Sequence, residues 1–152
     1  MIDALVPLAL LGSGLAAGIL LSTALGIIPL METFPADRYV YSHRYLWGRY
    51  DPFMPICFGL TVVADVVLAA TAPDRVAQVM FAVTAVTLCC VMGISIVKQV
   101  PINRWVKSID PESLPEDFER LDPRSRWRNW NLLRTVLSCA GFALNIAAAS
   151  VL

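Results

Sequence analysis

The chain has 152 residues, of which 57% are hydrophobic and 16% are charged, and its formal net charge is zero. Soluble domains carry about a quarter charged residues, so this composition excludes a disordered chain, a collagen and most soluble enzymes. The balanced charge offers no basic surface for nucleic acid. A single membrane domain over residues 1–152 is therefore predicted.

Four apolar stretches each approach the roughly 20 residues that a helix needs to cross about 30 Å of hydrocarbon. They cover about residues 5–31, 53–71, 79–97 and 132–152. The first is interpreted as a membrane helix and not as a signal peptide, because it lacks a basic start and carries Asp3. The predicted fold is all-α: an integral membrane bundle of four transmembrane helices.

The first apolar stretch contains several small residues. Gly14 and Gly18 form a GxxxG pair, and Gly12 precedes them. Small residues let two helix backbones approach closely in a membrane. Packing within one four-helix bundle explains them, and self-association into a homo-oligomer is the alternative.

The connection between the first two stretches, about residues 34–53, contains the only histidine, His43, among many aromatic residues. The ordinary imidazole pKa of about 6.5 suits a general base, whereas a loop histidine is more often merely solvated. Tyr45 and Trp47 are candidates for the wall of a flat apolar ligand site, with the phenol hydroxyl fixing orientation. Anchoring at the membrane interface is the alternative role for these aromatic residues.

Asp65 lies near the middle of the second stretch. An ionisable group at that depth is costly and is a candidate for function. It is either a proton acceptor or a neutral packing residue, with Asn145 of the fourth stretch as a hydrogen-bonding partner. Because the chain has one histidine and no carboxylates with metal-ligand spacing, we expect no bound metal.

The connection between the third and fourth stretches is predicted to be helical and cytoplasmic. Ser113-Leu114-Pro115-Glu116 fits a capping box, which predicts a short helix that ends at about Leu121. Asp122-Pro123 then predicts the start of a helix that continues into the fourth stretch.

Three polar or aromatic residues share one face at the start of the fourth stretch: Trp127, Asn131 and Arg134. Asn103, at the end of the third stretch, is expected at the same mouth. Arg134 stays charged among apolar neighbours, so it needs an anionic or carbonyl partner. That partner is either a lipid phosphate or an oxyanion on a bound substrate.

Basic residues indicate the topology. Of the 12 lysine and arginine residues, all but Arg75 lie in or beside the two long connections. The positive-inside rule therefore predicts a cytoplasmic-membrane protein with both long loops in the cytoplasm and both termini outside.

Short motifs at the third and fourth stretches are Val100-Pro101-Ile102-Asn103, Trp127, Trp130-Asn131 and Arg134-Thr135. With the four-span layout and the glycine-rich first stretch, they resemble the anthrone oxygenase-like membrane family. The resemblance implies a membrane tailoring enzyme of polyketide-type metabolism. Some members oxidise anthrones to anthraquinones with molecular oxygen as co-substrate and with no known organic cofactor or metal.

The resemblance also implies roles for individual residues. Arg134, Asn131 and Asn103 would hold the enolate oxygen of an apolar small-molecule substrate, and Trp127 would stack on its rings. Removing a proton from such a substrate gives an electron-rich anion that reacts with oxygen.

The base is left open between His43 and Asp65. Family members often carry a histidine directly after the asparagine of the fourth span, where this chain has Leu132. This departure favours substrates other than an anthrone, including oxidation or coupling at nitrogen. From a different class of function, a non-enzymatic scaffold or export subunit is the alternative.

Overall fold

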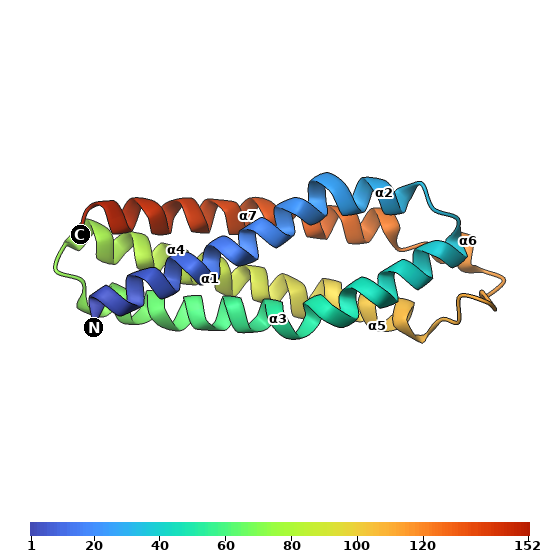
Figure 1. The fold of residues 1–152 in the computed structure, drawn as a ribbon, viewed down its shortest axis with the longest axis horizontal. Coiled ribbons are helices and arrows are strands. Elements are labelled where there is room, and N and C mark those ends of the chain that lie inside the picture. The colour runs from blue at the N-terminus through green and yellow to red at the C-terminus, as the bar shows by residue number, and fades with distance from the viewer.

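Four long helical segments run side by side in the computed structural model, which describes residues 1–152 (Figure 1). They cover Ile2–Glu32, Ala36–Thr71, Arg75–Ser108 and Phe118–Ser150, and each is long and apolar enough to cross a membrane. The structure contains no strand beyond an isolated bridge between Asp110 and Ser113. The all-α prediction with four membrane-length helices is confirmed.

The first and third segments are each divided by a π-helical turn. The first consists of α1 (Ile2–Ser22), the π-helix η1 (Thr23–Ile27) and α2 (Ile28–Glu32). The second is a single helix, α3 (Ala36–Thr71). The third consists of α4 (Arg75–Ile94), the π-helix η2 (Ser95–Gln99) and α5 (Val100–Ser108), and the last of α6 (Phe118–Leu121) and α7 (Arg124–Ser150).

Proline explains both π-helical turns. Pro29 and Pro101 each lie two residues after a π-helical segment. A proline inside a helix has no N–H to donate, and its ring clashes with the carbonyl group four residues earlier. Those carbonyl groups belong to Leu25 in η1 and Val97 in η2, so each helix widens where the clash would occur.

The long helices form a square bundle. α1 packs against α3 and α7, and α4 packs against the same two helices. Both termini lie at the same end of the bundle as the short α3–α4 turn, whereas α2, α5 and α6 lie at the other end (Figure 1). The short turn is closed by Asp74, whose Oδ1 accepts the N–H groups of Val76 and Ala77 at 2.8 and 2.9 Å.

The two glycines of the predicted GxxxG pair lie in different surroundings. A Cβ on Gly14 would lie 3.1 Å from the ring of Phe142 on α7, whereas a Cβ on Gly18 would meet no atom within 4 Å. Gly14 therefore serves packing within the bundle, and the homo-oligomer stays a prediction.

The prediction of a loop over residues 34–53 is wrong, because α3 begins at Ala36 and continues through Pro52 and Pro55. Its first turns bury Tyr39, His43 and Trp47, which recur every four residues and so share one helix face. His43 is consequently a fully buried helical residue and not a solvated loop residue.

The short helix predicted before the fourth segment is smaller than expected. α6 begins at Phe118, and Ser113 donates its N–H to the Asp110 carbonyl group in a turn instead of opening a helix. Asp122 precedes the N-cap residue of α7, Pro123, and its Oδ1 accepts the N–H of Arg124 at 2.9 Å. The long final helix therefore starts one residue later than the sequence predicts.

Candidate functional site

A cavity of about 440 Å³ lies between all four helical segments. Its apolar wall comes from each of the first three segments and includes Ile19, Leu20, Met54, Phe58, Met92 and Val100. Both π-helical turns contribute to it, η1 through Thr23 and η2 through Ser95, Ile96 and Gln99. π-helical turns are frequent at functional sites because they change which side chains a helix presents.

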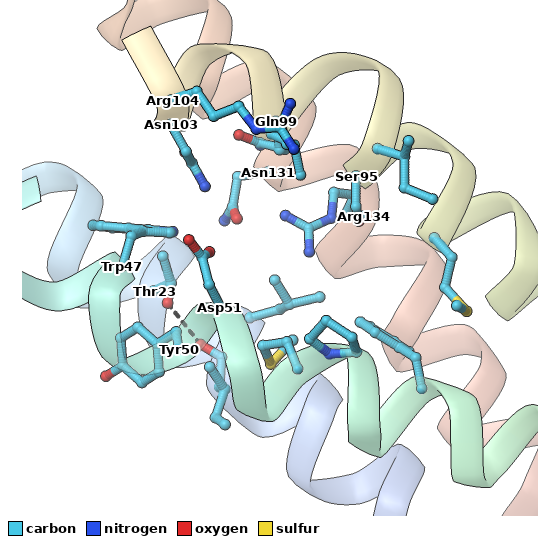
Figure 2. A pocket seen from close by; sticks show the side chains of 18 of the residues that line it. Thr23, Trp47, Tyr50, Asp51, Ser95, Gln99, Asn103, Arg104, Asn131 and Arg134 are labelled. Atoms are coloured by element: carbon cyan, nitrogen blue, oxygen red, sulfur yellow. Dashed lines mark hydrogen bonds between the residues drawn. The ribbon is translucent and has the colours of Figure 1, made fainter. Parts of the chain in front are cut away.

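Arg134 is a buried cation that faces this cavity without a partner. It is 8% exposed, takes part in no ion pair, and its Nε is buried without a hydrogen-bond partner. Figure 2 shows its guanidinium group directed into the space toward Asp51, whose charge acts on it across the cavity. An unpaired buried charge is costly, so this position favours an anionic ligand in the cavity.

Two amide side chains face the same space. Asn131 is 2% exposed, and its Nδ2 has no hydrogen-bond partner. Asn103 uses its Oδ1 to accept hydrogen bonds from the Nε1–H of Trp127 at 3.0 Å and from the Nε2 of His43 at 3.2 Å. Its Nδ2 is therefore left to donate into the cavity, beside Asn131 and Arg134 (Figure 2).

His43 lies behind the cavity wall and does not line it. Because an amide oxygen only accepts hydrogen bonds, the imidazole carries its hydrogen on Nε2 when it bonds to Asn103. Its Nδ1 is buried without a partner. The ring stacks on Trp47 at 4.5 Å and meets Trp127 edge-on at 5.7 Å. In this arrangement His43 and Trp127 fix the orientation of Asn103.

Asp65 belongs to a separate polar cluster in the bundle. Its Oδ2 accepts a hydrogen bond from the Nδ2 of Asn145 at 3.4 Å, and the same Nδ2 lies 3.4 Å from the Oγ of Ser13. All three side chains are almost fully buried, and none lines the cavity. The predicted contact between Asp65 and Asn145 is thus present, away from the other candidate residues.

Tyr45 and Trp47 lie on different faces of α3. Trp47 is 7% exposed and lines the cavity. Tyr45 is 52% exposed, lies outside the cavity lining, and places its ring under the guanidinium group of Arg49 at 3.7 Å. Residues two apart on a helix do not share a face, so only Trp47 forms part of an aromatic wall.

The cavity lining also contains charged residues that were not predicted from the sequence. Asp51 pairs with Lys107 through its Oδ2, and Arg104 lies nearby. Asp51 follows Trp47 by four residues, and Lys107 follows Asn103 by four. In two helices this spacing places each charged residue on the same face as a predicted site residue. The lining holds one carboxylate and three cations, Arg104, Lys107 and Arg134.

This set of side chains suits an apolar ligand that carries one anionic oxygen. The amide donors and Arg134 converge on one region, and the rest of the lining is largely apolar or aromatic. No group of three or more His, Cys, Asp or Glu side chains comes together in the structure.

A family model described as Anthrone oxygenase matches residues 41–144. The match runs from the first half of α3 into α7 and so includes His43, Asp51, Asn103, Asn131 and Arg134. No curated protein and no solved structure matches the chain.

Proposed function

Because the chain belongs to the anthrone oxygenase family, we propose that it is a membrane-embedded oxygenase that acts on an activated apolar metabolite. The substrate class is an anthrone or a related phenol, molecular oxygen is the co-substrate, and neither a metal nor an organic cofactor takes part. The observation that carries this proposal is the buried, unpaired guanidinium group of Arg134 in a cavity with largely apolar walls.

The proposed reaction requires only a few groups from the protein. An anthrone has an acidic methylene group between two aromatic rings, and loss of a proton from it gives an enolate in conjugation with the carbonyl group. The enolate passes one electron to oxygen, the two radicals recombine to a peroxide, and loss of water gives the quinone. A base, a partner for the enolate oxygen and a site that excludes water are sufficient.

Three donors that face the cavity would bind the enolate oxygen: Arg134 and the amide groups of Asn131 and Asn103. Fixed donors stabilise developing charge because they need no reorganisation during the reaction. His43 and Trp127 keep Asn103 in its donating orientation. Trp47 supplies the aromatic wall, and an apolar substrate and oxygen both reach a membrane protein through the lipid.

Oxygen uptake tests the proposal. Detergent-purified protein given a hydroxylated anthrone is expected to consume oxygen and release the quinone faster than the same substrate autoxidises in protein-free detergent. Uptake is measured with an oxygen electrode, and the quinone by its absorbance. A folded protein that gives only the autoxidation rate would leave a membrane scaffold or an enzyme of another substrate class.

The topology is testable through single cysteines in a chain whose four native cysteines are replaced by alanine. Glu116→Cys, in the exposed α5–α6 connection, is expected to react with a membrane-impermeant maleimide only after cells are permeabilised. Pro73→Cys, in the exposed α3–α4 turn, is expected to react in intact cells. The reverse pattern of labelling would invert the orientation.

A further inference from the structure

The proposed reaction needs a base that touches the substrate, and neither His43 nor Asp65 lines the cavity. Among the lining side chains, Asp51 is the only carboxylate, and the other charged residues there are cations. A general base must lie within hydrogen-bonding reach of the proton that it removes. The choice among the lining residues therefore falls on Asp51.

We propose that Asp51 is the general base of this cavity and removes the methylene proton of the substrate. The inference rests on the proposed function. Asp51 lies on the same face of α3 as Trp47, the aromatic wall, and Figure 2 shows its carboxylate directed into the cavity opposite Arg134. A flat substrate whose carbonyl oxygen lies at Arg134 would extend across the cavity toward Asp51.

Lys107 holds the carboxylate of Asp51 in position. Its Nζ donates to Oδ2 of Asp51, and Oδ1 makes no hydrogen bond. One oxygen is thus anchored while the other keeps its lone pairs for a proton. A base fixed on one side loses little freedom when the substrate arrives.

Asp51 alone can account for every proton transfer in the reaction. The C–H bond breaks, an O–H bond forms on Oδ1 of Asp51, and the electron pair stays on the substrate as the enolate. Oxygen adds to the carbon after one-electron transfer, and Asp51 returns its proton to the peroxide anion. The carboxylate then takes the second methylene proton while the O–O bond breaks. The carbonyl group forms and hydroxide leaves. The hydroxide then takes the second methylene proton from Asp51 and becomes water.

Hydrogen–deuterium exchange separates proton removal from the oxygen step. Without oxygen, in D₂O, the wild-type protein is expected to exchange the methylene hydrogens of a hydroxylated anthrone faster than buffer does. Asp51→Asn is expected to slow both exchange and aerobic oxygen uptake about 100-fold or more, because a general base contributes about 10²–10⁴-fold. Substrate binding, measured by quenching of tryptophan fluorescence, should change little.

The matched control is Asp37→Asn on the same helix. Both carboxylates are exposed, but only Asp51 lines the cavity, so Asp37→Asn should leave exchange and uptake at wild-type rates. If Asp51→Asn does not fold, Asp51→Ser serves, because it also removes the carboxylate from a partly exposed side chain. This variant should slow exchange while binding is kept, and exchange at the wild-type rate would contradict the assignment.

The outcomes separate the two proposals. If the wild-type protein neither exchanges hydrogen nor takes up oxygen, the proposed function fails. If the wild-type protein is active and folded Asp51→Asn exchanges at the same rate, Asp51 is not the base and the oxygenase proposal stands. Loss of substrate binding in Asp51→Asn would instead show that the carboxylate serves only to bind substrate, which also overturns the base role.

Discussion

Arg134→Ala is expected to lower oxygen uptake about 100-fold or more. Removal of one donor to a developing oxyanion costs about 10²–10³-fold in other enzymes, and Arg134 is the cationic member of the donor set. Arg134→Lys keeps the charge but not the planar fork of donors, so its rate should lie between those of wild type and alanine. Initial rates of oxygen consumption at saturating substrate make the comparison.

The same position separates an enzyme from a scaffold through its effect on stability. An unpartnered buried charge costs free energy of folding, so Arg134→Met, which is similar in length and apolar, is expected to melt at or above the wild-type temperature while it loses activity. Thermal unfolding in detergent, followed by tryptophan fluorescence, measures this. Parallel losses of melting temperature and activity would indicate that Arg134 is structural.

Gly12→Ala is expected to destabilise the bundle by about 1–3 kcal/mol, as overpacking does in well-packed cores. A Cβ at this position would clash with the Oγ1 of Thr61 and lie 3.1 Å from the carbonyl oxygen of Cys57. Thr61 is fully buried and already donates to that carbonyl group at 2.8 Å, so it has little room to rotate. α1 and α3 would have to separate.

Gly18→Ala on the same helix is the matched control. A methyl group there meets nothing within 4 Å, and alanine in place of glycine in a helix stabilises by about 0.5–1 kcal/mol. Chemical or thermal unfolding of the two variants in one detergent should therefore shift in opposite directions. Equal shifts would mean that α1 does not pack as closely on α3 as described.

Much of the architecture follows from local sequence, because a membrane helix must be long, apolar and free of unpaired backbone groups. The part that escaped prediction is the helical conformation of residues 36–55 in α3, because Pro52, Pro55 and the charged residues around them are typical of a loop. The burial of His43 and Trp47 at four-residue spacing outweighs that composition. Once the region is helical, Asp51 falls on the same face as both.

The candidate site was predictable in part. Arg134 was found because it is charged among apolar neighbours, and Asn103 and Asn131 because they flank the same mouth. Which residues touch was not predictable, since the contacts of Asn103 with His43 and Trp127 join helices far apart in the sequence. Asp65 is the opposite case. It was a candidate because an acid within a membrane helix is costly, but it bonds to Asn145 away from the cavity.

The π-helical turn η2 determines which residues of the third helical segment line the cavity. Ser95, Gln99, Asn103 and Lys107 recur at intervals of four and all line the cavity. In a regular α-helix such a row drifts around the axis by about 40° at each step, which spreads the four over a third of the circumference. The wider turn removes part of that drift and gathers them. A chain that gained or lost one residue in η2 would rotate Asn103 and Lys107 together away from the cavity, so the length of η2 matters to the cavity lining as well as the identity of its side chains.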